Sequence, residues 1–439
     1  MELKGWRIMN LKDEKFKLLQ REEFAESNVP AGCSLIEIFD SFLDEELLTE
    51  IWQSIDKEEW DQGSDGYLSH GNYSARLIYV YFACYIRIMA EGRTNNDEER
   101  PLRGSITRAL NNLEKDSNIS SEYPKAHSLQ LLFNRFHISI AFLSKICENF
   151  RKSLAKIGTM VAGDEKLYHF TGDSALIRVV ISKPDRIGLW FYELSCLFKD
   201  NSPYLLDTFV NNSCVEGGIK NPVVEVVKHW VKTEEPFFSQ QPEKRSILLF
   251  DSYYTSKDSI DYLIKNHIDF IGAVSPHRFP DLVDYLIDQN GQLSKAGESS
   301  AIINDLSNEI LVHHYDMNSR IGKRYVLSNA FKPARDTRSL AGQLPLYDDY
   351  HTRFSICDRF NRGLNRDSFP HKTGGKNRKG EDGVIHKFIL VVIMKNIHSL
   401  AKNLPNSSFS SISFRTMCLQ LSVQLFKRGT QSLNSIEKA

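Results

Sequence analysis

Apolar residues recur at helical spacing through most of the first 160 positions. The pattern predicts one helix over residues 36–55, with Ser41 or Asp44 as its candidate cap, and a second over residues 73–89. The same spacing returns over residues 129–154. We therefore expect the amino-terminal part of the chain to be mostly helical.

From about residue 160 the pattern changes to short apolar runs bounded by turn residues. Helices predicted over 223–231 and 257–266 alternate with a buried strand predicted over 268–274. Consecutive strands followed by such alternation are typical of a mixed α/β domain. The remaining predicted strands cover residues 166–170, 176–181, 187–198, 204–210 and 246–250.

Beyond this domain the chain is irregular over residues 278–345, with short strands predicted at 310–314 and 325–327. Helix is predicted again over 350–364 and 382–404, and residues 405–439 form a serine-rich, weakly amphipathic tail.

Length and composition fit a globular protein of several domains. The chain has 439 residues, of which 41% are hydrophobic and 25% charged. This composition excludes a disordered chain, a collagen-like chain and a coiled-coil rod. The longest strongly apolar run covers residues 388–394, too short for a membrane span, and residues 1–20 lack the apolar core of a secretory signal. We expect no membrane partner.

The seven cysteines limit the chemistry further. No two of them lie within four residues of each other, which excludes a CxxC zinc ribbon and argues against a disulfide framework. A reducing compartment, cytosol or nucleus, is therefore expected. The sequence contains no phosphate-binding GxxxxGK[ST] loop, no GxSxG elbow and no HExxH zinc helix.

The net charge of −1 hides an uneven distribution along the chain. Residues 31–65 carry eleven acids and one base, whereas residues 66–160 carry eight acids and thirteen bases. Residues 161–439 carry 35 bases and 31 acids. The total alone argues against a nucleic-acid partner, but the distribution allows a local, modest grip on DNA outside the acidic segment.

Carboxylates beside predicted strands are the candidate chemistry. Asp164 and Glu165 open the first strand of the α/β part, Asp251 ends a very apolar strand, and Asp358 lies at the start of a helical stretch. Strand ends are the usual site position in open sheets. Carboxylates that converge there can hold hard cations, and a pair of Mg²⁺ ions supports phosphodiester chemistry. Spacing alone leaves the alternative of helix caps and surface charges open.

The sequence around these acids resembles the piggyBac family of DDE/D transposases, with the matching pieces in family order over about residues 35–403. Phe250-Asp251-Ser252-Tyr253-Tyr254-Thr255-Ser256 resembles the family's "DNFYTS" motif, which is the most specific match. The weaker matches are Val161 to Gly172 with the family's "DE" pair, Lys183-Pro184 with Gly188, Leu263 to Gly272, Val326-Leu327-Ser328, Tyr350 to Asp358, Asn396, Ile36 to Leu47 and Arg135-Phe136.

The resemblance implies a fold and a domain order. It implies an α/β protein with a ribonuclease H-like catalytic core, interrupted by an insertion and preceded by a mostly helical domain for DNA binding or dimerisation. On this basis we expect the helical domain over 1–160, the core over 161–277 and 346–404, the insertion over 278–345, and a tail without a zinc domain over 405–439.

The resemblance also implies an activity. Asp164, Asp251 and Asp358 match the family's three catalytic carboxylates, which hold two Mg²⁺ ions, with Mn²⁺ as a substitute. Asn361 stands where the family often has a second acid, and its oxygen could also reach a metal. Family members nick transposon ends, form hairpins and join the ends to TTAA targets in double-stranded DNA. A nuclear location, a homodimer and no organic cofactor are expected.

A basic, glycine-bearing segment over residues 371–379 is the candidate DNA contact, with a solvated surface loop as its alternative. Trp190, Tyr253 and Tyr254 are more often core aromatics than base-stacking platforms. The candidate DNA-binding residues are Lys372, Lys376, Arg378 and Lys379 in this segment, with Arg359 and Arg362 on one helical face after Asp358.

Departures from the family keep a second function open. Ser355-Ile356 replaces the family's Gly-Gly, Asn361 replaces an acid, and the cysteine-rich zinc domain of many members is missing. The alternative is a domesticated or decayed transposase-derived protein that binds DNA or a protein partner without catalysis. Retention of all three Asp residues favours the active enzyme, because mutually repelling acids have no other evident reason to persist.

Overall fold

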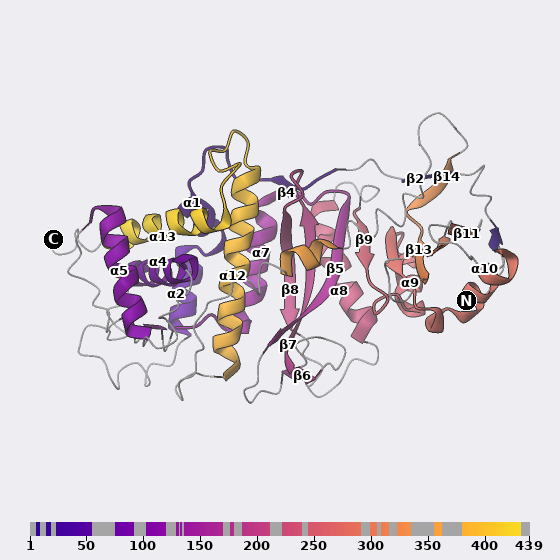
Figure 1. The fold of residues 1–439 in the computed structure, drawn as a ribbon, viewed down its shortest axis with the longest axis horizontal. Coiled ribbons are helices and arrows are strands. Elements are labelled where there is room, and N and C mark those ends of the chain that lie inside the picture. Colours follow the sequence, from indigo (N-terminus) through magenta and orange to yellow (C-terminus); the bar gives the residue numbers. More distant parts are fainter. Residues whose placement is uncertain are drawn as a thin grey trace. The chain divides into compact units, whose positions relative to one another are not determined.

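The computed structural model describes residues 6–8, 15–18, 23–54, 75–91, 102–119, 129–130, 132–133, 136–169, 176–179, 187–210, 222–238, 245–290, 299–304, 309–315, 323–334, 355–361 and 380–431 (Figure 1). The predicted DNA contacts Arg362, Lys372, Lys376, Arg378 and Lys379 lie outside these residues. The chain forms two compact units, one of residues 1–26, 155–166 and 190–360, the other of residues 27–154, 167–189 and 361–439.

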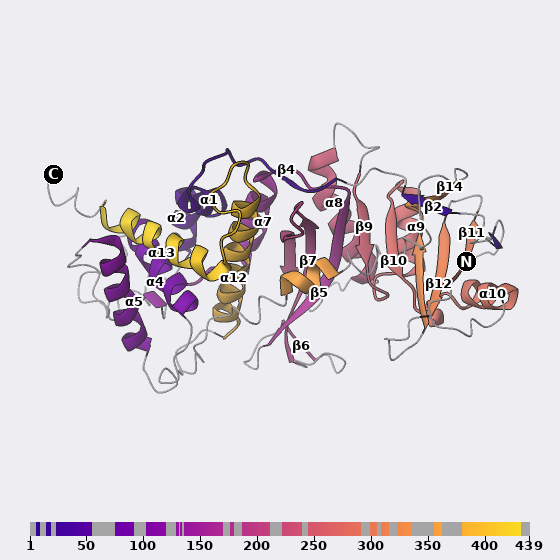
Figure 2. The ribbon, with the colours of Figure 1, turned by 45° about the horizontal axis from the view of Figure 1, so that its top comes forward.

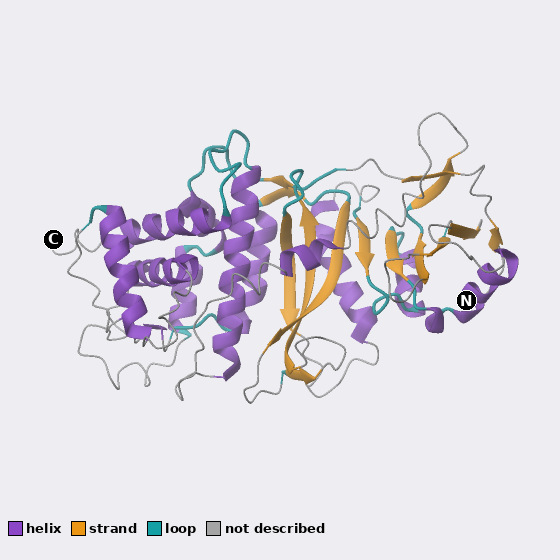
Figure 3. Cartoon of the chain, in the orientation of Figure 1, coloured by secondary structure: helices purple, strands orange, loops and turns teal. Residues whose placement is uncertain are grey.

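The second unit is largely helical, as predicted for the amino-terminal part (Figure 3). The helix predicted over 36–55 is two helices, because the Asp44 side chain caps a new start by accepting a hydrogen bond from the backbone of Leu47. Ser34 and Glu37 form a capping box at the first of them. The helices of this unit are α1 (Leu35–Phe42), α2 (Glu45–Gln53), α4 (Ala75–Glu91), α5 (Leu102–Ser117), α7 (Leu143–Lys152), α12 (Gly380–Asn403) and α13 (Phe414–Gln431).

Helix α12 agrees with the helix predicted over 382–404, whereas α13 corrects the prediction for the last segment. The predicted tail contains α13, whose Met417, Cys418, Leu421 and Leu425 are buried and which packs against α4. Gly383–Asn403 of α12 is long and apolar enough to cross a membrane, although its longest uninterrupted apolar run covers only residues 388–394. Because 78% of that window is buried inside the protein, α12 has the environment of a core helix.

Most strands of a mixed sheet belong to the first unit (Figure 2). Among the described residues the strand order of the sheet is β1-β11-β12-β13-β10-β9-β5-β7-β6, with β8 paired to β7, and β6 with the start of β7 belongs to the second unit. The strands are β1 (Trp6–Ile8), β5 (Met160–His169), β6 (Ile177–Val179), β7 (Ile187–Leu197), β8 (Pro203–Val210), β9 (Ile247–Phe250), β10 (Phe270–Ala273), β11 (Ser299–Asn304), β12 (Ile310–Tyr315) and β13 (Lys323–Ser328). Two short pairs lie apart, β2 (Lys15–Leu18) with β14 (Phe331–Ala334) and β3 (Glu26–Ser27) with β4 (Leu154–Lys156).

Strand β9 pairs in parallel with β5 on one side and β10 on the other. All four of its residues are buried, which suits a central parallel strand covered on both faces. Helices of this unit include α8 (Pro222–Phe238), α9 (Lys257–Lys265) and α10 (Pro280–Asn290), with the 3₁₀ turn η4 (Pro276–Arg278), and residues 355–360 are helical as well. The mixed α/β architecture is therefore confirmed, whereas its ribonuclease H-like character and the predicted domain boundaries stay predictions.

Candidate metal centre

The register of two parallel strands brings two of the predicted acids together. Gly163 of β5 pairs with Phe250, the last residue of β9. Asp164 and Asp251 directly follow these two paired residues in the sequence, so their side chains start at the same level of the sheet. The sequence predicts that Asp164 opens its strand. In the structure the apolar residues before Asp164 are also part of β5, which begins at Met160.

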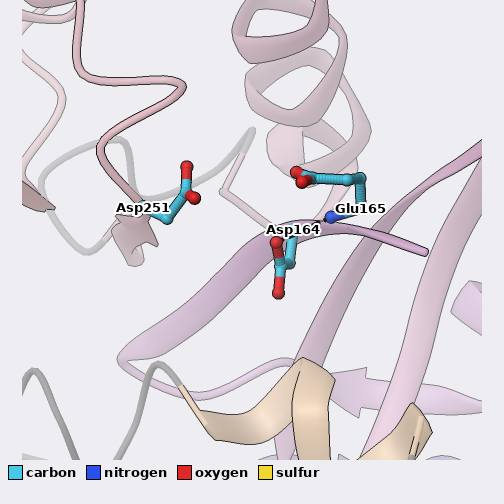
Figure 4. A group of neighbouring side chains, drawn as sticks. All are labelled: Asp164, Glu165 and Asp251. Atoms are coloured by element: carbon cyan, nitrogen blue, oxygen red, sulfur yellow. Dashed lines mark hydrogen bonds between the residues drawn. The ribbon is translucent and has the colours of Figure 1, made fainter. Parts of the chain in front are cut away.

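A third carboxylate completes the cluster. Asp164, Glu165 and Asp251 each offer an oxygen atom, and these atoms all lie within 4.8 Å of one another (Figure 4). Asp164 is buried and 8% exposed, and Asp251 is partly exposed. Three like charges at this spacing repel one another, and a bound cation would relieve the repulsion.

Backbone donors and one phenol orient these carboxylates. Asp164 Oδ1 accepts a hydrogen bond from the backbone N–H of Glu165 at 2.8 Å, and Asp251 Oδ1 accepts one from Tyr253 at 2.7 Å. The Tyr254 hydroxyl donates to Glu165 Oε2 at 2.7 Å. Burial, and next the negative charge of Glu165, raise the pKa of Tyr254 well above its ordinary value, so the phenol stays a donor.

Glu165 lies in the "DE" pair of the sequence, but the resemblance assigns the metal ligands only to Asp164, Asp251 and Asp358. Successive side chains of a strand point to opposite faces of the sheet, so Glu165 is expected to point away from Asp164. The tertiary contact with Tyr254, a fully buried residue from the segment after β9, decides where the Glu165 carboxylate lies.

Tight packing behind β5 fixes the position of the cluster. A Cβ atom on Gly163 would lie 2.5 Å from the ring of Trp230, a fully buried residue of α8. The Trp230 ring also contacts Tyr254, with ring centroids 4.7 Å apart. Only glycine therefore lets α8 approach the strand this closely beside Asp164.

Asp358, the third predicted acid, does not belong to this cluster. It is exposed in the helical segment 355–361, whose Ile356 and Cys357 are buried. The Cys357 thiol donates to the backbone carbonyl of Ala162 in β5 at 3.2 Å. Burial, and after it the negative charge of Asp164, raise the pKa of the Cys357 thiol.

The other described candidates lie in or near this segment. Arg359 donates from Nη1 to the backbone carbonyl of Asn201 at 3.3 Å, which ties its side chain to the protein. Asn361 is buried, with 6% of its surface exposed. Ile356, in place of a family glycine, is fully buried and fills core space.

The fold and the acidic cluster together define a mixed α/β protein with two carboxylates inside strand β5 and a third directly after the adjacent parallel strand β9. No protein-family model matches the sequence, and no curated protein matches it. The fold is similar to that of a piggyBac transposase, solved as a synaptic complex with hairpin DNA, with a TM-score of 0.67. The match is 13% identical and covers 94% of this chain and 84% of the other. The chain therefore has a piggyBac transposase-like fold.

Proposed function

We propose that this protein is a piggyBac-like DNA transposase that cleaves transposon ends and joins them to target DNA with the help of divalent metal ions. The observation that carries the proposal is the cluster of Asp164, Glu165 and Asp251, inside strand β5 and directly after the adjacent parallel strand β9 of a piggyBac transposase-like fold. Its substrate is double-stranded DNA, with TTAA-like targets.

The donor set suits magnesium. Three carboxylates offer only hard, negatively charged oxygens, which Mg²⁺ and Mn²⁺ prefer over the nitrogen and sulfur ligands typical of zinc sites. When bound, divalent ions supply the positive charge that activates a nucleophile and stabilises the leaving oxygen of a phosphodiester.

The chain's own residues have separate roles in this proposal. Asp164 and Asp251 would hold the cations from adjacent parallel strands, and the Tyr254 hydroxyl orients the Glu165 carboxylate, which would be a further ligand. Asp358 remains a proposed ligand, because the contact of Cys357 with Ala162 anchors its segment on β5 two residues before Asp164. The homodimer and the nuclear location belong to the same proposal.

Cleavage of a labelled DNA duplex tests this function. With Mg²⁺ or Mn²⁺ we expect the wild-type protein to nick the duplex, and Asp251→Asn or Asp164→Asn to lower the rate at least about 100-fold, as expected when several kcal/mol of charge stabilisation are lost. Asp261→Asn, a change at an exposed acid of α9, is the matched control and should cleave at the wild-type rate. Equal cleavage by wild type and Asp251→Asn would contradict the proposal.

The exposed position of Asp358, outside the cluster, favours the second function. In that reading the protein is a transposase-derived DNA-binding protein without catalysis. It predicts metal-independent DNA binding and no cleavage by the wild type, so the same experiment separates the two functions.

A further inference from the structure

Two aromatic side chains beside the carboxylate cluster remain partly exposed. From Gly188 to Leu197, Trp190 is the only residue of β7 that is not buried. Tyr253 is likewise partly exposed, whereas its neighbour Tyr254 is fully buried. The Trp190 and Tyr253 rings lie 6.4 Å apart between centroids, with their planes at 41°. Two large rings from separate elements thus meet where the sheet meets solvent.

These rings lie next to the acids. Tyr253 donates its backbone N–H to Asp251, and the two residues are separated only by Ser252. Burial raises the pKa of Tyr253, and the negative charges of Glu165 and Asp251 add to the effect. The backbone hydrogen bond places Tyr253 beside the carboxylate cluster.

Arg278 holds the Tyr253 ring in place. Its guanidinium lies 5.7 Å from the ring centroid, and Nη1 donates to the backbone carbonyls of Tyr253 and Thr255. Arg278 is exposed, so it borders solvent beside an acidic site. Because these contacts already order the arginine and the ring, little side-chain entropy remains to be lost when a ligand binds.

We propose that Trp190 and Tyr253 form a stacking site for an unpaired nucleobase of DNA, next to the phosphodiester on which the carboxylate cluster acts. The inference rests on the proposed function. Carboxylates repel the phosphates of DNA, so a DNA strand beside the cluster needs a binding contact that does not depend on phosphate charge. Aromatic faces provide it, because every base has a π-face that can stack without sequence preference.

Binding of single-stranded oligonucleotides without divalent metal tests the site apart from cleavage. The probes are a 12-nucleotide oligothymidine and the same strand with four central abasic residues, both in EDTA. We expect Trp190→Ala and Tyr253→Ala to weaken binding of the intact strand about 5- to 150-fold, the range for one lost base–aromatic stack. Trp190→Phe should retain most of the affinity. Tyr262→Ala, at a partly exposed tyrosine of α9, is the matched control and should bind as the wild type.

The abasic strand decides the interpretation. Stacking predicts that this strand binds the wild-type protein weakly and that Trp190→Ala weakens it no further. An equal loss for intact and abasic strands, or no loss for either, would overturn the stacking site. Tight binding of free thymidine monophosphate would also overturn it, since the ligand would then be a nucleotide and not a strand.

Failure of this inference is distinguishable from failure of the proposed function. Metal-dependent cleavage that Asp251→Asn abolishes, together with unchanged strand binding by Trp190→Ala, would remove the stacking site and leave the transposase intact. Base-dependent binding without any cleavage by the wild type would do the reverse. Circular dichroism melting curves show whether each variant is folded, and Tyr253→Ala carries the test if Trp190→Ala is not.

Discussion

At the scale of single residues, the unusual groups are buried acids. Glu234 of α8 is 4% exposed, and its Oε1 atom has no hydrogen-bond partner among the described residues. Burial raises the pKa of Glu234 to about 8, against a smaller opposite effect of the Arg245 charge. Near neutral pH this carboxyl is therefore largely protonated in the folded protein.

This group should make stability fall as pH rises. The folded pKa of about 8 lies above the ordinary value of 4.5, so the folded state binds more protons than the unfolded state between these two values. The protonated Glu234 carboxyl therefore makes its full contribution to the free energy of unfolding below about pH 4.5, and this contribution is lost as pH rises to about 8. The free energy of unfolding falls by no more than about 1.4 kcal/mol per pH unit over this range. Thermal unfolding of wild type and Glu234→Gln at pH 5.5, 6.5 and 7.5 measures it.

We expect the unfolding temperature of the Gln variant, relative to wild type, to rise steadily across these pH values. Glu225→Gln, at a carboxylate of the same helix that pairs with Lys228 near the surface, is the control and should show no such trend. A constant difference for Glu234→Gln would mean that the group is ionised in the fold.

At the scale of elements, the start of strand β5 and its pairing depend on contacts between residues far apart in the chain. The sequence predicts the β-rich region after residue 160, but not the start of β5 at Met160 or its register with β9. These depend on pairing with a strand about ninety positions away, which no local pattern encodes. The same holds for Glu165, whose carboxylate is placed by Tyr254.

Gly163→Ala tests the packing of strand β5 against helix α8. The added Cβ would lie 2.5 Å from the buried Trp230 ring, so strand or helix must shift. Overpacking of this kind costs about 1–3 kcal/mol of stability. Because Asp164 is the next residue, we also expect slower DNA cleavage.

Gly383→Ala in α12 is the matched control, since a Cβ there meets nothing within 4 Å. In a helix this change should stabilise by up to about 1 kcal/mol. Urea unfolding compares the two variants, and equal stability changes of the same sign would refute the packing argument.

At the scale of the whole molecule, each compact unit is assembled from separate stretches of the chain. The carboxylate cluster belongs entirely to the unit that contains residues 155–166 and 190–360. A cation at the cluster should therefore stabilise this unit, because ligands that bind only the folded state shift its unfolding equilibrium.

We expect Mn²⁺ at about 100 times its dissociation constant to stabilise the unit by about 2.7 kcal/mol, seen as a later thermal transition. Asp251→Asn should abolish the shift. Tyr254→Phe should reduce it, because the Glu165 carboxylate loses the donor that orients it. A shift that survives in Asp251→Asn would place the metal elsewhere.

The sequence by itself determined the helical and α/β regions and pointed to Asp164 and Asp251 beside predicted strands, because periodicity and local polarity are written in neighbouring residues. It left Ser41 and Asp44 as candidate caps, and the structure selects Asp44. The resemblance in its motifs pointed to the fold that the structural comparison supports. Only the tertiary structure decided that Glu165 joins the cluster while Asp358 stays exposed, and that α13 is buried. Those outcomes depend on strand register and on contacts between residues far apart in the chain, and no local pattern carries that information.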